Sequence, residues 1–361
     1  MKIVKRLFLA LLILIILLAG SAFALPYLFK DKLTALAKEE INKNVQAKVD
    51  FNGVGLSLIR SFPNFSLALE DYSVTGINEF EGIPLATGKS IGFTLDLMSV
   101  ISSTRPVEVK SVTLEEPNIH VVILKDGRAN YDIALPAEET TTDTTAETDY
   151  SNVLIQLQEY SISNGSLIYD DRSLDVYADA RNINHRGSGD LTIDVYDLDT
   201  YTEVGSLSVE QSGITYLKNA QATLSAIFNI EQSISKYNLK DNELAINDLR
   251  LTADGFVQLV DDDIDMELVF KSPQNDFKSL LSMVPNAYIE GYEDVKADGK
   301  FTLSGEVKGT YNGDREEYPG FRIESSITGG NVQYPGLPLG IRNINSQVEV
   351  NSPGSDFDDL T

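Results

Sequence analysis

Cysteine is absent from this chain of 361 residues, and histidine occurs only twice, as His120 and His185. Without cysteine there can be no disulfide, thiolate nucleophile or zinc–thiolate centre, and two histidines are too few for a histidine-rich metal centre. Positive charge is also scarce, because 54 acidic residues outnumber 29 basic ones and the net charge is −25. A chain of this sign repels phosphate backbones, which argues against nucleic acid as a partner.

Enzyme motifs are missing as well. The segment that starts at Gly53 resembles a dinucleotide-binding G-x-G-x-x-G, but Leu58 stands where the third glycine belongs. A phosphate-loop pattern ending at Ser90 fails in the same way, because Ile83 replaces its first glycine. No G-x-S-x-G nucleophile elbow occurs in the sequence. We therefore predict a protein with no catalytic residue, no metal and no cofactor.

A run of aspartates offers the one pattern that suggests a cation. Asp261, Asp262, Asp263 and Asp265 could supply hard oxygen ligands to calcium. The run lacks the spacing and the glycine of an EF-hand. We therefore favour the alternative, a solvated hairpin turn before a strand that contains Ile264.

A long apolar run follows three cations at the N-terminus. Lys2, Lys5 and Arg6 precede a stretch from Leu7 to Phe29, about 23 residues, which is long enough to cross a bilayer. Cations favour the side that does not translocate, so the N-terminus is expected in the cytoplasm and the bulk of the chain across the membrane. The anchor residues are Leu7, Phe8, Leu11, Leu12, Ile15, Ile16, Leu18, Phe23 and Leu25.

The same run has a second interpretation as a cleaved signal peptide. Ala22, Phe23 and Ala24 fit the small-x-small pattern of a cleavage site. Apolarity continues through Leu25 to Phe29, however, so the run is longer than a signal peptide needs. We favour a retained, single-pass anchor.

An amphipathic helix is expected directly after the anchor, from Asp31 to about Val45, because apolar residues recur there at helical spacing. This helix is either a plug on the end of a larger body or a surface spacer with an ordinary buried stripe, and we favour the spacer. The apolar stripe consists of Leu33, Leu36, Ala37 and Ile41.

From about Asp50 onward, short alternating segments are separated by Gly, Asn, Asp or Pro, which is the pattern of strands with one buried face. Helical patterns long enough to cover a parallel sheet are absent, so antiparallel hairpins and meanders are expected. One short helix is predicted from Asp276 to about Val284, with Asn275 as its N-cap. Residues 136–149 contain only threonine, acidic and small residues, which predicts a disordered linker rather than a binding tail.

An internal repeat predicts duplicated β units. Residues 161–169 and 326–334 share the pattern S-I-x-x-G-x-(L/V)-x-Y, and the tetrapeptide Arg-Asn-Ile-Asn follows at 181–184 and again at 342–345. Two landmarks in the same order and at nearly the same spacing indicate duplication. Because the chain stops soon after the second tetrapeptide, we expect it to be the N-terminal part of a longer protein, the alternative being a natural stop.

The order of the landmarks resembles the start of AsmA-like proteins from Gram-negative envelopes. The segment Ser57–Pro63, S-L-I-R-S-F-P, precedes an alternating strand. The segment P-N-I-H-V at 117–121 and the following D-G-R-A-N-Y at 126–131 are similar to that family's P-x-I-x-(L/V) strand and D-G-x-x-N turn. The resemblance covers the whole chain and implies a periplasmic body, anchored in the bacterial inner membrane and related to bridge-like lipid-transfer proteins.

The expected fold is mainly β, with an N-terminal transmembrane helix and an amphipathic helix followed by an elongated, curved antiparallel β-sheet groove and a few short helices. A closed sandwich or barrel would give the same alternation, so the expectation of an open groove rests on the anchor, the repeat and the resemblance together. The expected divisions are an anchor (1–29), an amphipathic helix (30–49), a first groove segment (50–135), a linker (136–149), a second groove segment (150–325) and the start of a further repeat (326–361).

The resemblance implies a non-enzymatic phospholipid carrier or bridge that contributes to outer-membrane lipid homeostasis. Acyl chains would cover the apolar side of the groove at about 0.8 kcal/mol per buried CH₂. The alternative is a structural factor for outer-membrane protein assembly, which binds envelope proteins and carries no lipid. The candidate lipid-facing residues are Phe65, Leu67, Leu69, Ile91, Phe93, Leu95, Ile264, Met266, Leu268, Phe270, Phe301 and Leu303.

Overall fold

The computed structural model describes residues 30–57, 63–102, 107–135, 153–273, 276–283, 295–313, 315, 317–334 and 336–354. The expected anchor, the expected linker and most of the S-L-I-R-S-F-P segment lie outside these residues. Within the described part, no helix is long and apolar enough to cross a membrane.

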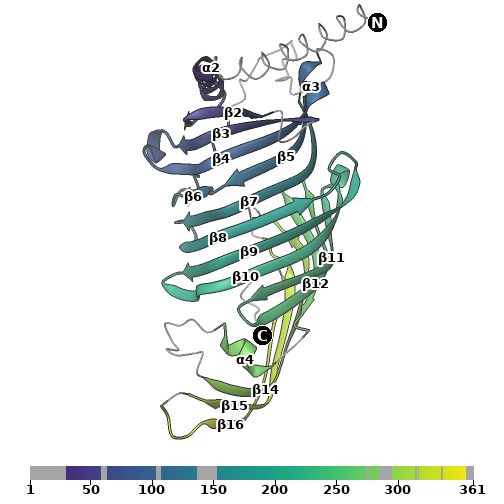
Figure 1. Ribbon diagram of the computed structural model, residues 1–361. Coiled ribbons are helices and arrows are strands. Elements are labelled where there is room, and N and C mark those ends of the chain that lie inside the picture. Colours follow the sequence, from purple (N-terminus) through teal and green to yellow (C-terminus); the bar gives the residue numbers. More distant parts are fainter. Residues whose placement is uncertain are drawn as a thin grey trace, which may run out of the picture.

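One sheet of 16 strands forms almost the whole body, which confirms the mainly β prediction (Figure 1). The strands follow one another across the sheet nearly in chain order, except that β2 pairs beside β1 on β3, and β6 pairs with both β4 and β7. The strands are β1 (Lys48–Asp50), β2 (Gly53–Ser57), β3 (Asn64–Thr75), β4 (Pro84–Asp96), β5 (Val107–Glu115), β6 (Asn118–Ile123), β7 (Val153–Asp171), β8 (Val176–Ser188), β9 (Val195–Gln211), β10 (Ile214–Glu231), β11 (Lys236–Ile246), β12 (Leu249–Val260), β13 (Asp263–Lys271), β14 (Lys296–Tyr311), β15 (Gly320–Gln333) and β16 (Ile341–Ser352).

The antiparallel prediction holds for every strand pair except two. Strand β7 runs parallel to β5 and to β6, which lie end to end along it. A parallel pair needs a long crossover connection, and the chain between Ile123 and Val153 is long enough to supply one. The acidic, threonine-rich segment belongs to this connection.

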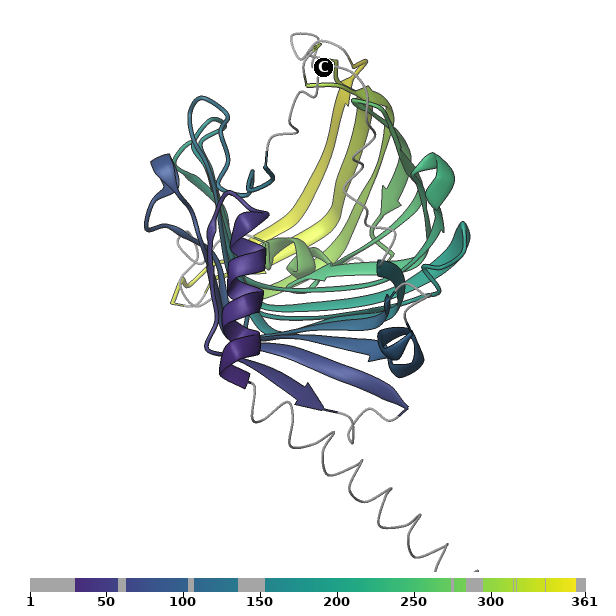
Figure 2. The ribbon, with the colours of Figure 1, turned by 90° about the horizontal axis from the view of Figure 1, so that it is seen from above.

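Alternation along the strands gives the sheet one apolar and one polar side. Opposite residues in a ladder lie on the same side, and Leu67 faces Phe93 while Ser66 faces Thr94. We call the side that carries Leu67 and Phe93 the apolar face, and the side that carries Ser66 and Thr94 the polar face. Figure 2 shows that the sheet curls into an open arc, with helix α4 (Phe277–Leu281) inside the curve.

A row of left-handed residues crosses the first half of the sheet at matching register. Asp71, Glu116, Asn164, Asn182 and Asn219 have φ values of 50°, 49°, 53°, 53° and 51°. The ladders place them on β3, after β5, and on β7, β8 and β10 along one line. We call this line the crease. A left-handed residue in a strand makes a bulge that bends and twists the sheet, so a row of them bends the sheet along the row.

The crease changes which positions point to the apolar face. Leu114 faces Ile162 on one side of it, and Ile119 faces Leu167 on the other. Along the sequence, Leu114 and Ile119 are five positions apart, and so are Ile162 and Leu167. In a regular strand, residues on the same face are separated by an even number of positions. The bulge absorbs the extra residue, and the apolar side therefore stays on the same face across the bend.

The internal repeat encodes two copies of the same bulged hairpin. In the first copy the backbone N–H of Asn164 donates to Oδ1 of Asn184 (3.1 Å), and in the second the N–H of Gly329 donates to Oδ1 of Asn345 (3.0 Å). The ladder is irregular next to Gly165 and next to Gly330 in the same way. The predicted duplication is therefore also a structural one.

The helices lie at one edge of the sheet and at the ends of its strands. Helix α2 (Lys30–Lys43) lies over the strands β1 and β2 at the first edge, a position closer to the plug than to the favoured spacer (Figure 1). Ile41 is half-buried, and the side chains of Leu33, Leu36 and Ala37 lie outside the described residues. The other helices are α3 (Leu97–Ile101), η1 (Asn78–Phe80) and η3 (Gln232–Ile234).

Helix α4 confirms the predicted short helix but corrects its N-cap. The N-cap is Asp276 instead of the expected Asn275, and its carboxylate accepts a hydrogen bond from the backbone N–H of Ser279 at 2.8 Å. Aspartate satisfies a free N–H of the first turn and interacts well with the positive end of the helix.

The crease yields a test of stability. Asn182 sits at a φ of 53°, where asparagine is tolerated and a β-branched residue is strained. We expect Asn182→Val to lower the free energy of unfolding by about 1–2 kcal/mol and Asn182→Gly to leave it nearly unchanged. Ser188→Val, on the same strand, is the control and should cost less than about 0.5 kcal/mol. Urea denaturation followed by circular dichroism measures all three, and an equal loss with valine and glycine would contradict the role of the left-handed backbone.

Candidate functional site

The apolar face is continuous across the sheet. Starting from Leu69, each ladder pairs one residue of a row with the next, so the row crosses nine strands without a gap in register. Every member except His185 and Thr202 is aliphatic. This row consists of Leu69, Ile91, Leu114, Ile162, His185, Thr202, Leu224, Leu244 and Leu251.

A second row continues the face to the later strands. It links the middle of the sheet to β15. Of its members, only Leu268 was among the candidate lipid-facing residues of the sequence analysis. The row consists of Leu198, Phe228, Leu239, Gly255, Leu268, Val307 and Phe321. Residues from distant parts of the sequence therefore share one apolar surface.

The predicted lipid-facing residues lie on this face, and most of them are partly exposed. Phe65, Leu67 and Leu69 face Leu95, Phe93 and Ile91 directly. Ten of the twelve residues are half-buried. The two exceptions are Leu95 and Phe301, with exposed fractions of 9% and 1%.

The burial of Phe301 reflects helix α4, which packs against β14. Asp276 pairs with Lys300 through an isolated bridge, and the ring of Phe277 lies against Gly330 on β15. A side chain at Gly330 would come within 3.2 Å of that ring. This helix therefore covers a small part of the apolar face.

The face does not have the burial of a closed core. All sixteen residues of the two rows are half-buried, and none of them is fully buried. In a sandwich or closed barrel, inward side chains pack against a second layer and lose nearly all contact with solvent. All the described strands belong to one sheet instead, and Figure 2 shows no second sheet against its concave side.

Polar groups interrupt the middle of the apolar face, in a region that the sequence analysis did not identify. Nδ1 of His185 lies 2.8 Å from Oγ1 of Thr202, and the ring centroids of His185 and Tyr160 are 5.2 Å apart. Tyr160 lies across Gly187, where a Cβ atom would come within 2.3 Å of its Cζ. No spacing rule points to these residues, because they come from three separate strands.

Burial sets the protonation of this polar region. Loss of hydration lowers the pKa of His185, which keeps its ring neutral at pH 7. Burial also raises the pKa of Tyr160, and the neighbouring phenol of Tyr196 adds to this increase. Burial raises the pKa of Tyr196 in the same way, with a further contribution from the phenol of Tyr237. The region is therefore polar but uncharged at neutral pH.

The polar face has a different chemistry, with ion pairs between residues of different strands. Nζ of Lys240 lies 2.8 Å from Oδ1 of Asp197, and Nζ of Lys308 lies 3.0 Å from Oε2 of Glu267. The hydrogen bond from Lys240 is the main cause of the lowered pKa of Asp197. Such exposed pairs add little stability, but they keep this side hydrated.

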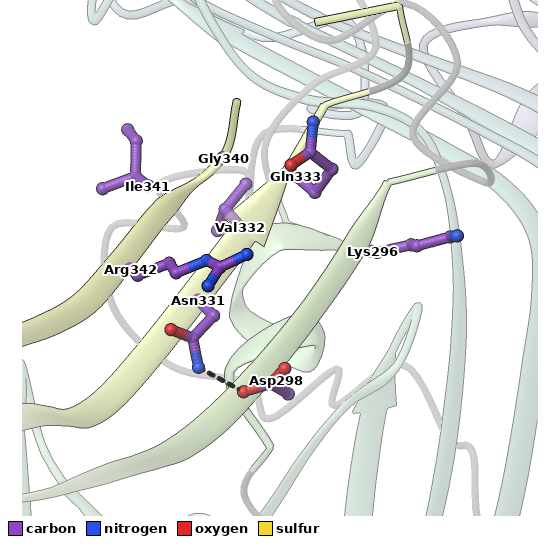
Figure 3. Close-up of a pocket in the computed structure, with 8 residues that line it drawn as sticks. All are labelled: Lys296, Asp298, Asn331, Val332, Gln333, Gly340, Ile341 and Arg342. Atoms are coloured by element: carbon purple, nitrogen blue, oxygen red, sulfur yellow. Dashed lines mark hydrogen bonds between the residues drawn. The ribbon is translucent and has the colours of Figure 1, made fainter. Parts of the chain in front are cut away.

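A surface pocket of about 320 Å³ lies at the ends of β14, β15 and β16 (Figure 3). The amide of Asn331 donates to Asp298 at 2.6 Å, and the side chain of Lys296 extends away from Arg342. The pocket is open and half polar, so it does not suit an acyl chain. Its lining residues are Lys296, Asp298, Asn331, Val332, Gln333, Gly340, Ile341 and Arg342.

The aspartate run forms the hairpin turn that the sequence analysis favoured. Asp261 has a φ of 53° between β12 and β13, and Asp263 accepts a hydrogen bond from Asn312 at 2.6 Å. The hydroxyl of Thr310 donates to Asp265 at 2.6 Å. Within the described residues, no group of three or more acidic or histidine side chains is arranged to hold a metal ion.

Comparison with known proteins identifies the family. The model of the AsmA family matches residues 1–282, which is most of the chain. Comparisons with curated proteins and with solved structures gave no match. The matched region includes the strands β1 to β13 and therefore most of the apolar face and the whole crease. The chain belongs to the AsmA family.

Proposed function

We propose that this protein is a non-enzymatic carrier or bridge that moves phospholipid within the cell envelope and contributes to outer-membrane lipid homeostasis. An N-terminal anchor holds it in the inner membrane, and the bulk of the chain lies in the periplasm. The apolar face carries the acyl chains, while the polar face remains in water.

The observation that carries this proposal is a large apolar surface that is in register across the sheet and only half-buried. Ten of the predicted lipid-facing residues remain partly exposed. Exposed apolar surface of this extent is unfavourable in water and marks a binding site. A ligand with long apolar chains covers it, whereas a compact polar ligand does not.

The energetics explain why a surface alone is sufficient. A phospholipid with about thirty chain CH₂ groups loses about 24 kcal/mol of favourable burial when it leaves a membrane for water. A continuous apolar face replaces that burial along the path, so the lipid avoids the aqueous intermediate. No covalent step is involved, which agrees with the lack of catalytic motifs in the sequence.

Family membership supports the cellular setting. The AsmA family match extends from the expected anchor through β13. Membership favours an envelope protein with a role in lipid transport. The location of the N-terminal segment and the direction of transport belong to the proposal.

Strand β16 favours a second candidate function, an assembly role with a protein partner. Within the described sheet, β16 pairs with β15 along only one side. Ile341 and Val348, on its apolar side, have exposed fractions of 68% and 52%. A free edge of this kind can add a strand from a partner protein. This function requires no bound lipid, and the next experiment separates the two.

Photocrosslinking tests whether lipid lies on the apolar face. We expect p-benzoylphenylalanine in place of Phe93 or Leu268 to form phospholipid adducts in cells that express the full chain. Both positions are half-buried on the apolar face. Thr113 is exposed on the opposite face and serves as the control, at which adducts should be rare. Mass spectrometry of the adducts distinguishes lipid transport from the assembly role. Protein adducts without lipid at Phe93 and Leu268 would favour the assembly role.

A charge on the apolar face tests whether the face is open. We expect Phe93→Glu to retain the fold and to slow the transfer of a fluorescent phospholipid between vesicles by about tenfold, because a carboxylate repels acyl chains. Thr113→Glu should change neither property. Leu95→Glu should unfold the protein, because Leu95 is only 9% exposed and a buried unpaired charge is strongly destabilising. Gross unfolding by Phe93→Glu, detected by circular dichroism, would indicate a closed core instead.

A further inference from the structure

Four ring side chains place polar atoms in the middle of the apolar face, in a region that we call the polar row. They are Tyr160 on β7, His185 on β8, Tyr196 on β9 and Tyr237 on β11, and all four are half-buried. The ladders put each of them on the apolar face, because Tyr196 and Tyr237 both face Ile230 and His185 faces Ile162.

The members of the polar row lie near one another. The ring centroids of Tyr160 and His185 are 5.2 Å apart. Tyr196 and Tyr237 lie on the two strands that flank Ile230 of β10, so the row extends from β7 to β11.

The polar row has hydrogen-bonding capacity that the protein does not use. Thr202 engages Nδ1 of His185 and fixes the ring, but Nε2 has no hydrogen-bond partner among the described residues. The same holds for the hydroxyls of Tyr160, Tyr196 and Tyr237 within the described part of the chain. None of these atoms is sealed from solvent, because Oγ1 of Thr34 is the one buried side-chain atom without a partner in the described part of the chain. They are therefore available to a ligand.

We propose that the polar row holds the phosphate group of an amphiphile whose acyl chains lie on the neighbouring apolar rows. The proposal rests on the proposed function and adds to it the place and the chemistry of headgroup recognition. Phenol O–H groups and the imidazole Nε2–H donate to phosphate oxygens, and hydrogen bonds to a charged acceptor are strong. The flanking residues Leu198 and Phe228 supply apolar contact beside the row.

The proposal predicts a link between ligand binding and the charge of His185. Tyr160 on β7 is the titratable group nearest to the ring, and Thr202 faces it from β9 without a charge. Arg186 and Asn184, its chain neighbours, point to the polar face, where Arg186 stacks on Tyr201. A bound phosphate would therefore be the nearest opposite charge, and it favours the protonated ring. Affinity for an anionic amphiphile should rise as the pH falls through the pKa of His185.

The chain offers an internal control for this measurement, because it has only two histidines. His120 alternates with Ile119 and Val121 on β6 and lies on the opposite face. The experiment uses the full chain in amphipol with ¹⁵N-labelled histidine, and nuclear magnetic resonance follows the pKa of His185 and the ¹⁵N resonances of His120. The probes are dodecyl phosphate, dodecyl maltoside and inorganic phosphate.

Dodecyl phosphate is expected to raise the pKa of His185 by about one unit and to leave His120 unchanged. Dodecyl maltoside should bind without shifting His185, and inorganic phosphate should do neither. An unchanged His185 while both amphiphiles bind would overturn the polar row and leave the proposed function intact. Failure of both amphiphiles to bind would contradict both. An equal shift with inorganic phosphate would identify a site for the free anion and overturn headgroup recognition.

Hydroxyl deletion gives a second measurement. Tyr196→Phe removes one donor from the polar row, and Tyr201→Phe removes one hydroxyl from the polar face as the matched control. We expect Tyr196→Phe to weaken binding of dodecyl phosphate by about tenfold while binding of dodecyl maltoside is unchanged. An equal loss for both probes, or an equal effect of Tyr201→Phe, would contradict phosphate recognition by the row.

Discussion

The structure depends on one constraint, namely that apolar side chains of neighbouring strands stay opposite one another while the sheet bends. A slip of one residue in any ladder would turn a whole strand's apolar side to the polar face. The ladders from β2 to β15 keep this register, so a single-layered sheet carries a continuous apolar surface. Nearly all other features either maintain that register or use the surface it creates.

The crease is the means by which register and bending are reconciled. A row of bulges shifts the alternation by one position in each strand, and the neighbouring strands make the same shift at the same line. Asn164 and Asn182 face each other's strands at this line, and Gly205 provides room beside Asn182, where a Cβ would be 3.0 Å from that of the asparagine. Asparagine is among the few residues that tolerate this backbone, which explains its recurrence in the duplicated segments.

Sequence reasoning predicted the apolar face well, because period-two alternation depends on local residues. It placed Phe65, Leu67, Leu69, Ile91, Phe93 and Leu95 on one apolar side, and the ladders pair the first three with the last three. It recognised the repeat but did not predict the bulged hairpin that the repeat forms, because a left-handed φ at Asn164 has no sequence signature beyond the asparagine itself. The burial of Phe301 depends on helix α4, which approaches from another segment.

Other features depend on contacts between distant strands, which no local pattern encodes. The parallel pairing of β7 arises from the choice of neighbours after a long connection. The polar row combines residues of four strands, from Tyr160 to Tyr237, and each of them alone resembles an ordinary strand residue. The polar face with its ion pairs was implied by alternation, whereas its partners, such as Lys240 with Asp197, were not.

The central claim is that the concave apolar face is occupied by acyl chains when the protein works. Cryo-electron microscopy of the full chain, purified from its native membranes in amphipol, addresses this claim most directly. The account predicts elongated density along the apolar face, in contact with Phe93 and Leu268 and ending in a compact feature beside Tyr196. Density of a protein partner on that face, or a second protein layer that seals it, would contradict the account.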